Sequence, residues 1–227
     1  MYVPNFIPEP LEVPGNVTIL PWRARVGFVR RVIFAHLVVL LTIGGLSRLP
    51  MPSVHPGWAW AAAGASLVVL DAIRVMRRGR RDEANLSLAF FPIAIVAIAV
   101  AVGLSDAAHW PFWAAPVGPA MLLVYAGVAR WDFSFVGGIL LALIGTLVTV
   151  SAVCLTVDSA RGQAAWAITI SLSYLVYFIY DLASLQSRRR PNEIGGAVVD
   201  LHRDVLNFVS YVPRVVFHWK RHRIWSA

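Results

Sequence analysis

The stretch FSFVGGILLALIGTLVTVSAVCL, residues 133–155, decides the class of structure that this chain adopts. It contains no Asp, Glu, Lys, Arg or His, and it exceeds the roughly 20 residues that a helix needs to cross a bilayer. In lipid, a lone segment has to satisfy its own backbone hydrogen bonds, and only a helix does so. This stretch is therefore predicted to be a membrane-spanning helix.

The composition of the whole chain agrees with that prediction. Of the 227 residues, 58% are hydrophobic and 14% are charged, whereas soluble domains average about 25% charged residues. At about 20 residues per span, the chain has room for six to eight helices and none for a separate soluble domain. The net charge of +8 comes from arginines in short loops between apolar runs, so it indicates membrane topology and not a nucleic-acid partner.

Hydropathy divides the chain into three regions. Residues 1–21 contain five prolines and are expected to form an extended arm, residues 22–219 form the membrane domain, and residues 220–227 form a basic tail. The last span is the least apolar and is either a full crossing, which we favour, or a re-entrant segment. We predict seven spanning helices, at about residues 32–49, 57–76, 85–104, 112–129, 133–155, 165–185 and 194–219.

The distribution of arginine predicts the orientation. The N-terminal flank, the loop after the second span and the loop after the sixth carry most of the positive charge. Because positively charged loops stay on the cytoplasmic side, we expect a cytoplasmic N-terminus in a bacterial inner membrane. The basic tail would then lie outside if all seven spans cross. Binding of anionic lipid is a secondary role for the arginine runs.

Two acids and one arginine lie at matched depth in the predicted spans. Asp181 precedes the basic run after the sixth span by about 10 Å of helix, and Asp204 lies about 12 Å into the seventh. Arg77 ends the second span on the same side. Buried carboxylates that share an arginine titrate as a unit, and clustered carboxylate oxygens also suit calcium. The alternative is an ion pair that only locks the helices together.

The remaining polar residues within the spans predict no further chemistry. Asp71 and Arg74 are one helical turn apart and are expected to pair with each other. His36 and His202 could be axial haem ligands, but packing histidines are the better interpretation. No catalytic or nucleotide-binding motif is present, so we expect neither an enzyme nor a cofactor. Only Asp181 and Asp204 are candidates for contact with a metal ion.

Five segments of the chain together match the motif pattern of a known membrane-protein family. In chain order they are RVGFVRRVIFAHLVVLLT (Arg25–Thr42), Met76-Arg77-Arg78, RWDFSFVGGIL (Arg130–Leu140), Tyr180-Asp181-Leu182 and LHRDVLNF (Leu201–Phe208). They resemble segments of the Bax inhibitor-1-like (transmembrane Bax-inhibitor-motif) family. The C-terminal pair is the most specific, since it matches a tyrosine–aspartate motif that closes the sixth helix and a leucine–x–x–aspartate–apolar–apolar–asparagine motif in the seventh.

This resemblance implies a bacterial protein with seven helices, of which the seventh is central and enclosed by the others. It also implies a pH-sensitive leak of calcium or other cations, in which Asp181 and Asp204 are the sensor pair and Arg77 is the partner of Asp181 in the closed state. The family has apolar or aromatic residues just before its seventh-helix aspartate. This chain has His202 and Arg203 there, and a neighbouring cation would hold Asp204 ionised.

Two functions follow for the lipid-embedded protein. The first is the proton-regulated cation leak, with calcium ions as the ligand. The second is a non-catalytic accessory subunit of a larger membrane complex, for example a photosynthetic or respiratory one, in which the Pro-rich arm lies along a partner subunit.

Overall fold

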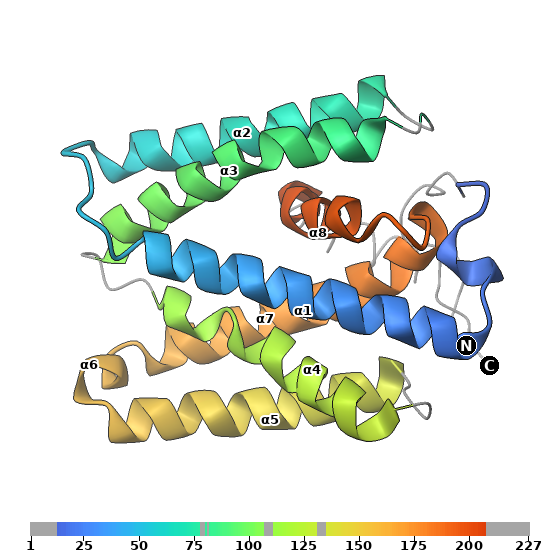
Figure 1. The fold of residues 1–227 in the computed structure, drawn as a ribbon. Helices are drawn as coiled ribbons and strands as arrows, with labels where there is room; N and C mark the ends of the chain where they lie inside the picture. The colour runs from blue at the N-terminus through green and yellow to red at the C-terminus, as the bar shows by residue number, and fades with distance from the viewer. Residues whose placement is uncertain (1–12, 78–79, 81, 107–110, 131–134, 208–227) are drawn as a thin grey trace, which may run out of the picture.

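The computed structural model describes the chain apart from residues 1–12, 78–79, 81, 107–110, 131–134 and 208–227 (Figure 1). All the regular elements of the described residues are helices, which confirms the predicted all-α class. The long helices are α1 (Trp22–Leu46), α2 (Pro56–Met76), α3 (Glu83–Asp106), α4 (Val117–Ala129), α5 (Phe135–Thr156) and α7 (Ala164–Arg188). The short ones are η1 (Val17–Ile19), η2 (Phe112–Ala114), α6 (Asp158–Arg161), α8 (Ile194–Arg203) and η4 (Asp204–Asn207).

Six segments of the described chain are long and apolar enough to cross a membrane, which confirms that this is a polytopic membrane protein. By length and hydropathy they are Trp22–Leu46, Pro56–Met76, Glu83–Ser105, Phe112–Ala129, Gly137–Thr156 and Ala164–Arg188. Each corresponds to one of the first six predicted spans.

The predicted seventh span, residues 194–219, is only partly described. Its described part is the 10-residue helix α8 followed by the turn η4. A helix of that length measures about 15 Å, half of the roughly 30 Å hydrocarbon core. Residues 208–219 and the basic tail at 220–227 lie outside the described residues, so the fold that we describe has six spans.

The helices are arranged so that α8 is enclosed at one end of the bundle. The α2–α3 hairpin and the α4–α5 hairpin lie on opposite sides, with α1 and α7 between them (Figure 1). Helix α8 packs against α1, α2, α3 and α7. Since the residues from Gly196 to Arg203 are all buried, this short helix forms part of the protein interior.

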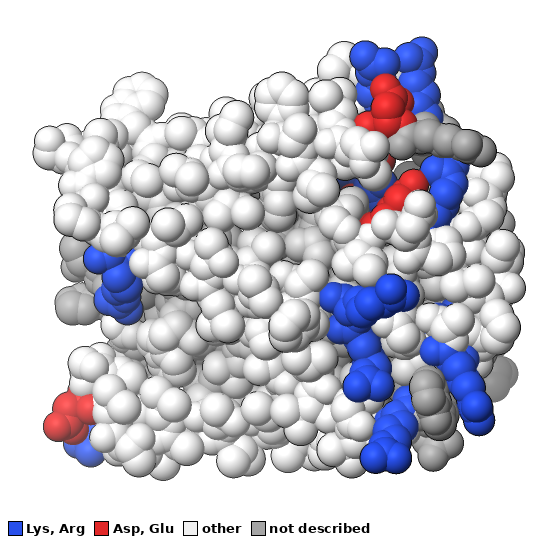
Figure 2. Space-filling model, viewed as in Figure 1, with Lys and Arg blue, Asp and Glu red and all other residues white. Residues whose placement is uncertain are grey.

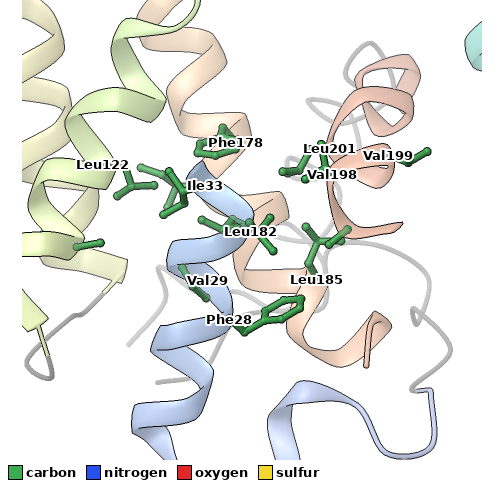
Figure 3. Close-up of a cluster of buried hydrophobic side chains, with 14 of the residues drawn as sticks. Phe28, Val29, Ile33, Leu122, Phe178, Leu182, Leu185, Val198, Val199 and Leu201 are labelled. Carbon is green, nitrogen blue, oxygen red and sulfur yellow. The ribbon is translucent and has the colours of Figure 1, made fainter. Parts of the chain in front are cut away.

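One hydrophobic core joins α8 to the long helices. It contains side chains from α1, α4, α7 and α8 that meet between these helices (Figure 3). The labelled members are Phe28, Val29, Ile33, Leu122, Phe178, Leu182, Leu185, Val198, Val199 and Leu201. The apolar face of α8 is thereby fixed against α1 and α7.

Part of the predicted N-terminal arm also packs on this end. The amide of Val13 donates to the carbonyl oxygen of Ser187 at 3.1 Å, and the amide of Val17 donates to that of Arg189 at 3.0 Å. The Val17 side chain is fully buried. The described part of the arm therefore covers the end of α7 in its own chain, while residues 1–12 lie outside the described residues.

The charged side chains are unevenly distributed between the two ends of the bundle. Figure 2 shows most Lys and Arg atoms at the end where α1 begins and where α2 is joined to α3. The opposite end shows only a few charged side chains in this view. A basic end and a largely uncharged body are typical of a bundle whose cytoplasmic loops are positive.

Small residues allow the helices to approach closely, as is common in membrane bundles. Ala59 and Ala63 of α2 pack against Ala101 of α3 in one cluster. At Gly103 of α3, an added Cβ atom would lie 2.7 Å from the carbonyl oxygen of Ser47. At Gly64 of α2, an added Cβ would meet nothing within 4 Å.

We predict that Gly103→Ala lowers the free energy of unfolding by about 1–3 kcal/mol, because the end of α3 must move away from the α1–α2 connection. Gly64→Ala is the matched control and should be neutral or stabilising, because alanine favours a helix over glycine. Equilibrium unfolding in mixed detergent micelles measures both. Equal effects of the two substitutions would contradict the close contact at Gly103.

Candidate functional site

Helix α8 carries charge into the interior of the bundle. Asp200, Arg203 and the following Asp204 are 1%, 1% and 4% exposed. A buried charge without a partner costs several kcal/mol, so each of these side chains requires a counter-charge from a neighbouring helix. For the two aspartates, Arg188 at the end of α7 and Arg189 next to it provide that charge. For Arg203, Glu83 of α3 provides it.

The first group of charges is centred on Arg188, and we call it the Arg188 cluster. The guanidinium of Arg188 donates to Asp181 through Nη2 and to Asp204 through Nη1, the latter at 2.6 Å. Arg74 of α2 donates to the other oxygen of Asp204 at 2.7 Å. Ser184 accepts from Arg188 at 2.7 Å and donates to Asp181 at 3.1 Å. One guanidinium thus joins two buried carboxylates, one from α7 and one just beyond α8.

The second group, the Arg189 cluster, connects α3, α7 and α8. Arg189 binds Asp200 through two nitrogens, at 2.6 and 2.7 Å, and Glu83 at 2.6 Å. Arg203 donates to Asp200, to Glu83 at 3.1 Å and to the carbonyl oxygen of Leu70 at 3.2 Å. Paired contacts of this kind between arginine and carboxylate are stronger than hydrogen bonds between neutral groups. They fix the position of α8 relative to α3.

The charges within each cluster balance. Burial alone would raise the pKa of Asp200, but Arg189 and Arg203 outweigh it and hold that pKa well below its usual range. Burial alone would lower the pKa of Arg189, but the carboxylate of Asp200 raises it above its usual value. Asp200 and Arg189 are therefore both ionised at neutral pH.

A glycine makes room for the Arg189 cluster at the start of α8. An added Cβ atom at Gly196 would lie 3.1 Å from Nη1 of Arg189 and 3.1 Å from the Cβ atom of Ala84. Any larger residue would push α8 away from α3. Gly196 in the sequence IGGAVVD therefore serves the geometry of the site.

The structure brings together two of the three residues predicted from the sequence. Asp181 and Asp204 bind the same arginine. Arg77 does not join them, because it caps the C-terminus of α2 and its Nη1 atom lies 3.4 Å from Asp82 in an exposed pair. The cation beside Asp181 is Arg188, and this corrects the expectation for Arg77, which rested on depth alone.

The expected pairing of Asp71 with Arg74 is also corrected, since Arg74 extends to Asp204 instead. Sequence reasoning missed Glu83, Asp200 and the structural role of Arg188 and Arg189. It interpreted the basic run after α7 as a topology signal, with binding of anionic lipid as a secondary role. The spacing of Asp200 and Arg203, one helical turn apart, was a usable signal for a buried pair.

The clusters provide few free ligands for a metal ion. Within the described part of the chain, no group of three or more His, Cys, Asp or Glu side chains is placed to hold one. Oδ2 of Asp181 is buried and has no hydrogen-bond partner. It is the only oxygen of the two predicted aspartates in that state, so a cation would first have to displace Arg188 or Arg74 from the others.

The fold and the site define a class of protein: a polytopic helical membrane protein with a charge network buried at its basic end. Comparisons with protein-family models, with curated proteins and with solved structures found no match for this chain. The resemblance to the Bax inhibitor-1-like family therefore rests on the sequence segments quoted above.

We predict that Asp200→Asn lowers the free energy of unfolding by about 3–5 kcal/mol, because it leaves Arg189 and Arg203 short of buried counter-charge. The matched control is Asp158→Asn, which breaks an exposed pair with Arg161 and should cost at most about 1 kcal/mol. Equilibrium unfolding in mixed micelles measures both. A loss at Asp200 as small as that at Asp158 would show that the Arg189 cluster does not hold α8.

Proposed function

We propose that this protein is a proton-regulated cation leak and that the Arg188 cluster is its gate. The observation that carries the proposal is the single guanidinium of Arg188 bound to both Asp181 and Asp204. Asp181 belongs to α7 and Asp204 follows α8. Arg188 therefore ties α8 to α7, and this arrangement corresponds to the closed state.

Protons would open the gate by weakening these ion pairs. A protonated carboxyl group is neutral and loses most of its attraction for a guanidinium. Acidification would neutralise Asp181 or Asp204, release Arg188 and loosen η4 from α7. The leak is therefore expected to increase as the pH falls.

Solvent and ions would reach the gate from the basic end of the bundle. The side chain of Arg74 is 28% exposed although it binds the buried Asp204, so its outer part reaches the surface of the bundle close to the basic end of α2. Once Arg188 moves away, both oxygens of Asp181 and the Oδ2 atom of Asp204 become available, and calcium prefers such oxygen ligands. Calcium is accordingly the first ion to test.

The proposal includes a membrane and an orientation. The basic end of the bundle (Figure 2) and the positive-inside rule favour a bacterial inner membrane with the N-terminus in the cytoplasm. The gate would then respond to cytoplasmic pH. Labelling of single cysteines, introduced near the start of α1 and at Asp158, with a membrane-impermeant reagent tests the orientation.

We predict that Asp204→Asn raises the leak at neutral pH about tenfold, which corresponds to a bias of about 1.4 kcal/mol toward the open state. It should also weaken the pH dependence, because only the pair of Asp181 with Arg188 is left to titrate. The measurement is calcium flux into liposomes that contain purified protein and a trapped indicator. Asp181→Asn provides a second variant, and Asp158→Asn provides the control. A flux that is flat with pH in the unmodified protein would rule out the leak.

The correction at Arg77 gives a separate prediction. Arg188→Gln should raise the leak at neutral pH and weaken its pH dependence, because it removes the link between the two aspartates. Arg77→Gln should leave the flux unchanged, because Arg77 pairs with the exposed Asp82. The same liposome assay compares the two variants. The reverse result would restore Arg77 as the gating cation.

A specific observation favours the second candidate, a non-catalytic accessory subunit. Each described cluster has two acids and two arginines, so its charges cancel. The bundle can therefore stay closed as a scaffold without binding any further ion. In that case Asp204→Asn would lower stability without any flux. The native protein would also be purified as a stoichiometric member of a larger membrane complex.

A further inference from the structure

Two buried histidines face each other between α1 and α8, outside both charge clusters. His36 is 1% exposed and His202 is 7% exposed. Their ring centroids are 4.7 Å apart and the rings are tilted by 57°. Aromatic rings surround the pair, with Phe178 stacked on His36 at 4.9 Å and Phe91 edge-on to His202 at 5.0 Å. The site is therefore shielded from solvent.

The hydrogen bonds of His202 determine where its proton is. Nδ1 of His202 lies 2.9 Å from the carbonyl oxygen of Val198. A carbonyl oxygen only accepts, so Nδ1 carries the hydrogen. In the neutral ring, Nε2 of His202 then carries a lone pair and no hydrogen. This atom is buried without a hydrogen-bond partner. It lacks a donor.

His36 has the complementary deficiency. Its Nε2 shares a hydrogen bond with the hydroxyl group of Tyr174, and its Nδ1 is buried without a partner. If Tyr174 donates to Nε2, then Nδ1 of His36 carries the hydrogen and lacks an acceptor. This tautomer gives the donor that Nε2 of His202 needs. The opposite tautomer would leave two lone pairs buried without partners.

The distance between the two ring centres distinguishes a metal ion from a shared hydrogen as the ligand of the pair. Two imidazoles on opposite sides of a haem iron, or in line on a two-coordinate metal ion, each bind at about 2 Å, which places the ring centres more than about 6 Å apart. A hydrogen bond between two ring nitrogens spans about 2.9 Å and places the centres close to 5 Å. The observed 4.7 Å therefore excludes a haem and fits a shared hydrogen.

The structure records no hydrogen bond between the two rings, so a small rotation of either ring has to complete it. We propose that His36 and His202 form a paired imidazole site whose ligand is a single proton, held between Nδ1 of His36 and Nε2 of His202. In the neutral state, Tyr174 donates to His36, His36 to His202, and His202 to Val198. The three hydrogen bonds are then all oriented in the same direction, and every ring nitrogen of the pair has a partner.

Uptake of one proton follows the same chain. The proton binds Nε2 of His36, the N–H bond at Nδ1 of His36 breaks, and that hydrogen forms a new bond to Nε2 of His202. The pair gains one positive charge, and every ring nitrogen keeps a partner. Because His36 lies near the middle of α1 and Tyr174 near the middle of α7, this proton site is deeper in the bundle than the Arg188 cluster.

The neighbouring charges do not compensate a proton on the pair. The acids of the two clusters are already matched by arginines, and α4 has no Asp, Glu, Lys or Arg in Val117–Ala129. Burial lowers the pKa of His202 to about 4, which agrees with a neutral ring at pH 7. Around the pair, the described titratable and charged side chains of α7 are Tyr174, Tyr177, Asp181 and Arg188, and that of α3 is Glu83. Those of α2 are Asp71 and Arg74, with Arg77 at its C-cap, and those of α1 are Arg23, Arg25, Arg30 and Arg31. Asp200 and Arg203 of α8 and the following Asp204 complete the set.

Nitrogen-15 NMR of the histidine rings in reconstituted protein tests this site without any measurement of flux, so its outcome is independent of the leak. We expect both His36 and His202 to carry their hydrogen on Nδ1 at neutral pH. On acidification, the signals of both rings should shift together in one transition that takes up one proton per pair. His36→Phe should move the titration of His202 to lower pH, because the acceptor for the added proton is lost.

Tyr174→Phe gives a second, milder variant, in which His36 should populate both tautomers because its Nε2 loses its donor. His55→Gln is the control, since His55 is an exposed N-cap residue of α2 and its removal should leave both signals unchanged. A hydrogen on Nε2 of His36 in the unmodified protein would overturn the proposal, because two facing lone pairs describe a metal site. Separate titration of the two rings would overturn it as well.

Discussion

The structure depends on one constraint: a short helix with charged residues is buried inside an apolar bundle. Asp200, Arg203 and Asp204 have almost no contact with solvent, and such charges are tolerated in a membrane only when they are paired. Arg188 and Arg189 at the end of α7 are partners of the two aspartates, and Glu83 of α3 is a partner of Arg203. The position of α8 is thus set by charge pairing as much as by its apolar contacts in Figure 3.

The two adjacent arginines divide the network into parts with different exposure. Arg189 is held by Glu83 and Asp200, and all three side chains are nearly inaccessible. The Arg188 cluster reaches the surface of the bundle through Arg74, which is 28% exposed. The Arg189 cluster is thus suited to hold α8 in place, and the Arg188 cluster is suited to respond to protons. Replacement of a charge in either part would disturb the other, because residues that share a network do not act additively.

The sequence was sufficient to predict the six long helices, because an apolar run such as residues 133–155 can satisfy its backbone hydrogen bonds in lipid only as a helix. It was not sufficient for the site. Depth along a helix placed Arg77 near Asp181, but depth does not define the face of a helix, and Arg77 lies beside Asp82. The basic run at Arg188 and Arg189 was interpreted as a topology signal, since a buried partner for it appears only when α8 folds back onto α7. The orphan nitrogens of His36 and His202 likewise depend on tertiary contacts between α1 and α8.

The most direct test of the account is a double-mutant cycle between Arg188 and Asp204, read out as the free energy of unfolding in mixed micelles. We predict that Arg188→Gln and Asp204→Asn together cost less than the sum of the single substitutions, with a coupling of about 1–3 kcal/mol. A parallel cycle between Arg77 and Asp204 should be additive within about 0.5 kcal/mol. Additivity in the first cycle would contradict the buried link on which both the fold of α8 and the proposed gate depend.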